Sequence, residues 1–186
     1  MSDIDYTVKH YKKTLTTVEF YEKFFNFDYV QNFCKQCPRY DTNYSCSPVD
    51  IDIKEFVMGY DYIDIHVTQL FFKAEDYEKD YSEDELKDFL YDTFFKEKKK
   101  VASEVLDSEK KYSKAQSLTG PCNHCAENCK ELYSSCKHPE IRRYSLASIG
   151  MDSKKILKDL FGIDLLLING VLPKYLNNIS SILYKK

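Results

Sequence analysis

Glycine is scarce in this chain of 186 residues, which contains five. Neither G-x-G-x-x-G nor G-x-x-x-x-G-K-[ST] occurs, so the loops that cradle dinucleotides and nucleotide phosphates are missing. The G-x-S-x-G turn of α/β-hydrolases is missing as well. Dinucleotide and P-loop chemistry are therefore disfavoured.

Charge of one sign and long apolar runs are also lacking. The chain has 27 basic and 30 acidic residues and a net charge of −3, which argues against a nucleic-acid partner held by a basic field. The run Ile163–Ile168 is far shorter than the roughly 20 residues that cross a bilayer. Residues 1–6 have neither the basic nor the apolar region of a secretion signal. We therefore expect a cytoplasmic protein with no membrane partner.

Cysteine, in contrast, is concentrated in two short stretches. The upstream thiols are Cys34, Cys37 and Cys46, and the downstream thiols are Cys122, Cys125, Cys129 and Cys136. An odd number of closely spaced thiols in a reducing cytosol indicates metal or redox chemistry rather than a disulfide framework. Free cysteine also packs as a small buried hydrophobe, but the downstream thiols have mostly polar neighbours in sequence. All seven are thus candidate metal ligands.

The spacing favours iron–sulfur clusters over zinc. Structural zinc sites often combine two separated ligand pairs, whereas the four downstream thiols fall within fifteen residues, as in the compact loops around a [4Fe–4S] cluster. The three upstream thiols leave one position for a histidine, water, a substrate or a thiol such as Cys129. His10 or His66 could fill that position, and His124 could bind zinc. We predict one or two [4Fe–4S] clusters, with zinc as the alternative.

Several cations and one tyrosine stand near these groups. A cluster held by four thiolates is negative, and nearby cations could offset the cost of burying it. Those that flank the downstream thiols are Lys130, Lys137, Arg142 and Arg143. Tyr40 follows Cys37 closely, whereas the lysine-rich run at 96–100 is interpreted as a solvated helix face.

Periodicity predicts strands alternating with helices. Strands are predicted at 4–8, 63–67, 114–118 and 163–168, the last buried on both faces. Helices are predicted from Thr16 or Thr17 to Phe33, with a stripe that includes Val18, from the capping box Ser82–Glu85 to Leu106, after a Ser153 cap to Gly162, and from Pro173 onward. We expect one α/β domain over residues 1–186, with a small mixed sheet flanked by helices and the cysteine-rich metal-binding loops at one end.

The cysteine segments resemble a family of small bacterial and archaeal proteins described as predicted metal-binding. Its first pattern, C-x-x-C-P-x-Y…C-P-P, corresponds to the upstream thiols with Pro38, Tyr40 and Pro48, and Ser47 replaces a proline. Its second pattern corresponds to the downstream thiols followed by Pro139, Arg143, Ser145, Leu146, Gly150 and Asp152. Ala147 stands where that family commonly has glutamate. The resemblance runs from Cys34 to Ile168, and it implies metal binding without a particular reaction.

Three functions fit these observations. The first is an iron–sulfur protein with two cluster sites, one of them partly open, that transfers electrons to a redox partner protein or acts on a small-molecule substrate. The second is a structural zinc module that presents an interaction surface. The third is a metal or redox sensor. An enzymatic role stays open, because no catalytic residue is indicated.

Overall fold

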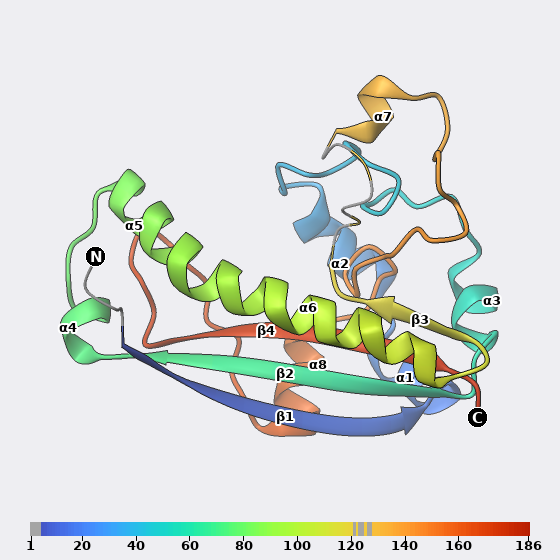
Figure 1. Ribbon diagram of the computed structural model, residues 1–186, viewed down its shortest axis with the longest axis horizontal. Helices are drawn as coiled ribbons and strands as arrows, with labels where there is room; N and C mark the ends of the chain where they lie inside the picture. The colour runs from blue at the N-terminus through green and yellow to red at the C-terminus, as the bar shows by residue number, and fades with distance from the viewer. Residues whose placement is uncertain (1–4, 121, 123–124, 126–127) are drawn as a thin grey trace.

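A four-stranded sheet forms the centre of the molecule. The structure is a computed structural model that describes residues 5–120, 122, 125 and 128–186. The strand order is β1-β2-β4-β3, and all three pairings are antiparallel (Figure 1). The strands are β1 (Tyr6–Thr16), β2 (Tyr62–Phe72), β3 (Ala115–Leu118) and β4 (Tyr175–Tyr184).

Helices cover both faces of this sheet. Side chains alternate between the faces of a strand, so Ile63 and Ile65 of β2 pack with α1 and α8, whereas Leu70 and Phe72 pack with α5. The first face carries α1 (Thr17–Phe24) and α8 (Ser153–Ile156), which continues as a π-helical turn at Leu157–Phe161. The second face carries α5 (Glu83–Leu90), a π-helical turn at Tyr91–Phe95 and α6 (Lys96–Ser108). The remaining elements are α2 (Phe27–Cys34), α3 (Ile53–Met58), α4 (Ala74–Tyr77), a 3₁₀ turn at Glu109–Lys111 and α7 (Cys129–Leu132).

The predicted α/β class is confirmed, with a sheet flanked by helices and the cysteine-bearing loops gathered at one end (Figure 1). The sheet differs from the prediction in one respect. It is antiparallel rather than mixed, because the two strands of each pair run in opposite directions. The central predicted strand is present and longer, as β2. The capping box at Ser82 forms, with Glu85 N–H 3.3 Å from the Ser82 hydroxyl oxygen that accepts from it.

The predicted helix from Thr16 to Phe33 is interrupted. Thr16 caps α1 as expected, but Phe25 is extended and pairs with Met151 as an isolated bridge. Asn26 N–H donates to the Gly150 carbonyl at 2.9 Å, and α2 then begins after this residue. A tertiary contact therefore overrides the helical pattern. Val18, predicted to lie on the buried stripe, is 52% exposed.

The predicted helix after Pro173 is wrong, because this segment forms β4. Its apolar residues are spaced like a helical stripe, yet Leu176 and Ile182 pack on one face of the sheet and Ile179 and Leu183 on the other. A strand buried on both faces needs apolar residues at both odd and even positions, and their spacing can then resemble that of an amphipathic helix.

The predicted strand at 163–168 is also wrong. This segment has no regular secondary structure, and Leu167 is 69% exposed. Asp164 interrupts the apolar run and pairs with Lys158 at 2.8 Å on the surface. The preceding helix is capped by Asp152 rather than Ser153, and Gly162 ends it with φ +68°, as predicted.

Within the described residues, no helix combines the length and the apolar character needed to cross a membrane.

Candidate metal centre

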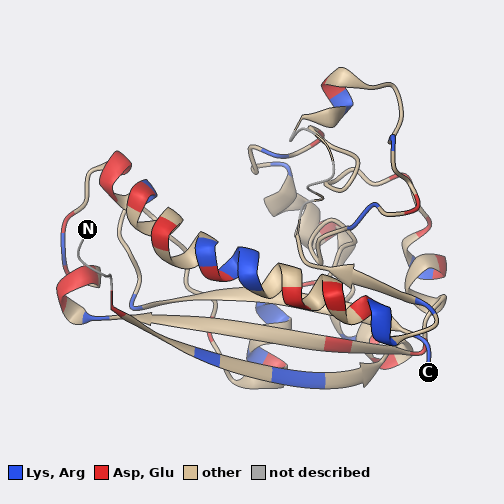
Figure 2. Cartoon of the chain, in the orientation of Figure 1, with Lys and Arg blue, Asp and Glu red and all other residues tan. Residues whose placement is uncertain are grey.

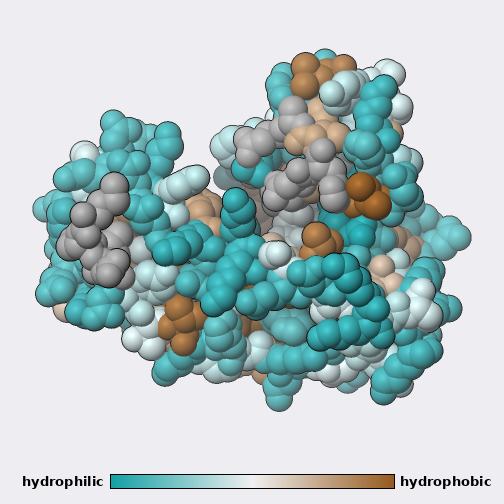
Figure 3. Space-filling model, viewed as in Figure 1, coloured by the Kyte–Doolittle hydropathy of each residue, from teal (hydrophilic) through white to brown (hydrophobic). Residues whose placement is uncertain are grey.

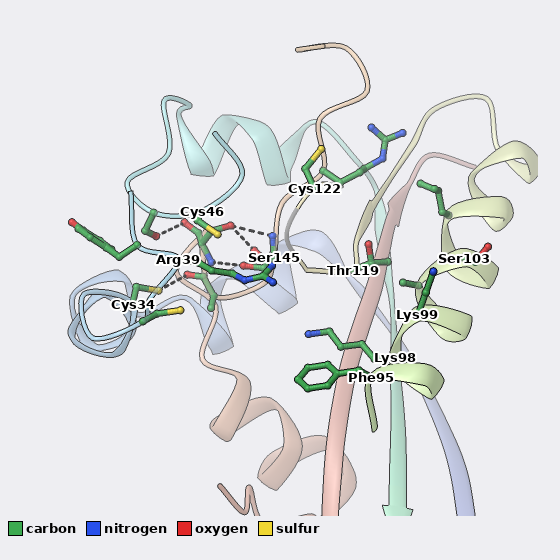
Figure 4. Close-up of a pocket in the computed structure, with 18 residues that line it drawn as sticks. Cys34, Arg39, Cys46, Phe95, Lys98, Lys99, Ser103, Thr119, Cys122 and Ser145 are labelled. Atoms are coloured by element: carbon green, nitrogen blue, oxygen red, sulfur yellow. Dashed lines mark hydrogen bonds between the residues drawn. The ribbon is translucent and has the colours of Figure 1, made fainter. Parts of the chain in front are cut away.

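The upstream thiols lie together around one cavity. Cys34 is the last residue of α2, and Cys37 and Cys46 follow in a series of turns that begins before Pro38. All three line a cavity of about 760 Å³ between this loop and α6 (Figure 4), which we call the thiol cavity. Its volume is within the range of small-molecule binding sites.

Side-chain and backbone hydrogen bonds shape the loop that carries these thiols. The Asn43 side-chain oxygen accepts from the N–H groups of Ser45 and Cys46, at 3.0 Å each. Gln31 of α2 donates to the Ser47 hydroxyl at 2.8 Å, and that hydroxyl donates to the Ser148 carbonyl at 3.3 Å. The loop is therefore fastened both to α2 and to the segment around Ser148, which forms another part of the cavity wall.

Burial makes two of the upstream thiols weaker acids. It raises the pKa of Cys34, against a hydrogen bond with Ser47 that lowers it. Burial also raises the pKa of Cys46, although Asn43 donates to its sulfur at 3.4 Å. The neighbouring Cys37 adds to the rise of both pKa values. Since a metal binds the thiolate, binding must release these protons.

The opposite wall of the thiol cavity is α6 and the turn before it. Phe95, Lys98, Ala102, Ser103 and Leu106 line it there, and Lys98 extends toward the cysteine loop (Figure 4). Burial lowers the pKa of Lys98, and the positive charge of Arg39 lowers it further. The interpretation of 96–100 as a solvated face is thus wrong for Lys98, because its side chain is partly buried and lines the thiol cavity.

Arg143, which lines the cavity, forms a nearly buried ion pair next to β3. Both Nε and Nη2 of Arg143 donate to the carboxylate of Glu109, at 2.8 and 2.6 Å, and each side chain is 14% exposed. The Glu109 carboxylate also accepts from the Ser117 N–H at 2.5 Å. Burial works against ionisation of Glu109, but its bonds with Arg143 and Ser117 prevail, and its pKa is lowered.

The downstream thiols gather around a second and much smaller cavity. Cys122, Cys125, Cys129 and Cys136 all line this space of about 10 Å³, which we call the tetrad cavity. Partial burial raises the pKa of Cys125, and the other three thiols raise it further. The four thiols that the sequence grouped together therefore border the same small cavity.

Arg142 brings a buried cation to the tetrad cavity. It is 8% exposed, its Nη1 donates to Asp50 at 2.8 Å, and its guanidinium lies 5.0 Å from the centre of the Tyr144 ring. Its buried Nε finds no hydrogen-bond partner among the residues that the structure describes. A donor in this position suits an anionic group held by the thiols.

The other predicted cations have separate roles. Arg143 lines the thiol cavity, as noted above. Lys130 pairs with Asp41 at 2.6 Å and thereby joins the two cysteine loops, whereas Lys137 lies over the Tyr133 ring. Tyr40, the tyrosine singled out from the sequence, lines the thiol cavity.

Cys122 connects the two groups of thiols, because it lines both cavities. The sequence suggested that a downstream thiol could serve the upstream site, with Cys129 as the example. Cys129 lines the tetrad cavity and is 9% exposed. Cys122 is therefore the better placed of the two to approach the upstream thiols.

The histidines are distributed differently from expectation. His10 contacts the Thr68 hydroxyl at 3.2 Å within the sheet, and the partly buried His66 lies two residues before Thr68 on β2. Neither histidine lines the thiol cavity or the tetrad cavity. Both are thus poorly placed to complete the upstream site. His138 lines the tetrad cavity, although nothing in its sequence context indicated this. His124 lies outside the described residues.

No formed coordination site is present in the described part of the chain. There, no three side chains of Cys, His, Asp or Glu are close enough together to hold a metal ion. The chemistry of the donors nevertheless fits a metal, since four thiols and Arg142 border one small space, and the buried Nε of Arg142 has no hydrogen-bond partner among the described residues.

The fold and these two groups of thiols define an α/β protein with cysteine-rich loops at one end. Residues 22–183 match the model of the family described as "Predicted metal-binding protein (DUF2284)", and the chain belongs to this family. The match therefore extends beyond the resemblance from Cys34 to Ile168 and includes most of β4. No curated protein and no solved structure matches the chain.

Proposed function

We propose that this protein binds iron–sulfur clusters at two sites and acts in electron transfer or in redox chemistry on a small substrate. The downstream thiols would hold a complete [4Fe–4S] cluster. The upstream thiols would hold a second cluster with one position open. The observation that carries the proposal is that the seven thiols line two cavities that share Cys122, one of which has room for a small molecule.

A bound cluster would supply one-electron chemistry, and an iron with an exchangeable ligand would also supply a Lewis acid. The chain's own residues have distinct parts in this scheme. Arg142 would donate a hydrogen bond from Nε and offset negative charge, and such donors raise the reduction potential of a cluster. Cys122 lies where the two sites adjoin, which suits electron passage between them. Electrons would be exchanged with a redox partner protein.

A second candidate is a structural zinc ion at the downstream thiols. The tetrad cavity of about 10 Å³ supports it, because this is roughly the space of a single water molecule. One tetrahedral ion fits such a space with little movement, whereas a cluster requires the loop to open. Under this alternative the metal would hold the two cysteine loops in place.

Anaerobic purification followed by iron, sulfide and zinc analysis separates these functions. We expect a brown protein with iron and acid-labile sulfide in equal amounts. A variant with serine at all three upstream positions should lose part of the iron, and Cys125→Ser should lose a different part. A colourless protein with zinc and no sulfide would support the second candidate. Loss of all metal in both variants would contradict two separate sites.

The open position has its own test. The reduced protein is titrated with cyanide while its EPR spectrum is followed. The signal of the upstream cluster should change, and the variant with three upstream serines should show no such change. A spectrum that is insensitive to cyanide would contradict an exchangeable ligand and leave electron transfer or a structural role.

A further inference from the structure

The charges around the thiol cavity are of one sign. Arg39, Lys98, Lys99 and Arg143 line it, and the described lining residues include no aspartate or glutamate. The whole chain has more acidic than basic residues, so this lining departs from its composition. Figure 2 shows the same contrast along the helical run, where basic residues at the start of α6 follow an acidic α5.

Lys98 is the cation best suited to receive a ligand. Arg143 is already neutralised by Glu109, whereas no carboxylate of the described residues lies within ion-pair distance of Lys98. Its amine is close to Gly120, where a Cβ would be 3.9 Å from Nζ. Gly120 has φ +111°, a conformation that favours glycine, and a Cβ there would make only ordinary van der Waals contact with Lys98.

Apart from Lys98 and Lys99, the α6 wall is apolar or carries a hydroxyl group. Phe95 and Leu106 are 47% and 38% exposed on the helical run, and both line the cavity with Ala102 between them. In the space-filling view the surface is largely hydrophilic and is hollowed between this helical run and the cysteine-bearing loops (Figure 3). Figure 4 shows Phe95 beside Lys98, so an apolar surface and a positive charge are presented together.

We propose that the thiol cavity binds a small organic anion, whose charged group contacts Lys98 and whose apolar part lies on Phe95. Half-buried cations raise each other's electrostatic energy, and the lowered pKa of Lys98 reflects burial first and the charge of Arg39 second. An anion bound between these walls offsets both the burial of the Lys98 charge and its repulsion by Arg39. The site goes beyond the proposed function, since it would exist whichever metal the thiols hold.

A different role for these cations is to balance the negative charge of a cluster at the upstream thiols. The two roles differ in what they require of position 98. Charge balance predicts that neutralising Lys98 changes metal content or reduction potential and leaves anion binding unaffected. An anion site predicts that anion binding is lost while metal content is retained.

The test is calorimetric titration of the protein as purified with benzoate and with benzamide, its neutral counterpart. Benzoate should bind, more weakly as salt is added, and benzamide should bind much less. Lys98→Gln should weaken benzoate at least about tenfold, as expected for loss of a hydrogen bond to a charged group. Lys98→Arg should retain most of the affinity. Lys100→Gln, at an exposed position on the same helix and outside the lining, should behave as the wild type.

Metal content is measured on every variant, which keeps the two proposals apart. Benzoate binding that depends on Lys98 in a protein without iron would support the anion site and contradict the cluster. An iron–sulfur protein that does not bind benzoate would do the reverse. Equal binding of benzoate and benzamide, or an unchanged affinity in Lys98→Gln, would overturn the anion site. Affinity that follows metal content rather than charge at position 98 would overturn it as well.

Discussion

Replacing Gly150 by alanine tests how the cysteine loops are fastened to the fold. Gly150 has φ +73°, and its carbonyl accepts from Asn26 N–H at the break between α1 and α2. A Cβ at this position would lie 2.9 Å from Phe27 Cδ2 and 3.0 Å from Phe25 Cε2. Real Cβ atoms essentially never lie under 3.0 Å from another atom, so the Phe27 ring must move. The Phe25 ring and the Phe27 Cα, which would be 3.1 Å away at the start of α2, must also give way by a few tenths of an ångström.

Two costs add in this variant. Holding an alanine in the left-handed region costs about 1–2 kcal/mol, and inserting a methyl group into a packed site costs about 1–3 kcal/mol. The free energy of unfolding should therefore fall by about 2–5 kcal/mol, a large share of the roughly 5–15 kcal/mol of a typical domain. Gly170→Ala provides the matched control, because Gly170 also has φ +73° but nothing lies within 4 Å of its Cβ position.

Urea unfolding of both variants, followed by circular dichroism at equal metal content, measures the difference. In Gly170→Ala the free energy of unfolding should fall only by the cost of the left-handed backbone conformation. Gly150→Ala should therefore be less stable than this control by about 1–3 kcal/mol. The slope of the transition should be the same in both variants. Equal losses would refute the close packing of Gly150 against the two rings, and with it this account of the interrupted helix.

Three further predictions follow from the site. Glu109→Gln leaves Arg143 with a weaker partner and should cost about 2–4 kcal/mol in urea unfolding, whereas Asp107→Asn, in an exposed pair, should cost less than about 1 kcal/mol. Because the pKa of Glu109 is lowered in the folded state, its ionised carboxylate stabilises the fold above the ordinary pKa of about 4.3. This stabilisation is lost as the pH falls through the lowered pKa, so the stabilities of Glu109→Gln and Asp107→Asn should converge in acid. Cys125→Ala should lower both metal content and melting temperature, and an unchanged melting temperature would argue against ligation by this residue. Burial raises the pKa of Cys34 and Cys46, so metal binding at the upstream thiols must release a proton from each. Metal affinity there, measured by chelator competition, should rise by about tenfold per pH unit for each proton released between about pH 7 and 8.5, and a flat profile would count against thiolate binding.

Local signals in the sequence predicted local structure well. The capping box at Ser82 and the alternating pattern of β2 depend on neighbouring residues alone, and both are present in the structure. The segment after Pro173 could not be recognised in this way. A helix and a doubly buried strand can both place apolar residues at the spacing of Leu176, Ile179 and Leu183, and only the pairing of β4 with β2 distinguishes them.

The sequence by itself determined which residues are candidate ligands, because the thiols of each group are close together along the chain. Only the tertiary structure decided what surrounds them. Packing of α6 across the sheet brings Lys98 to the upstream thiols, and the fold of the loops puts Cys122 in contact with both cavities and buries Arg142 at one of them. These contacts join segments that are distant in the chain. Their geometry depends on strand pairing and core packing, which no local motif encodes.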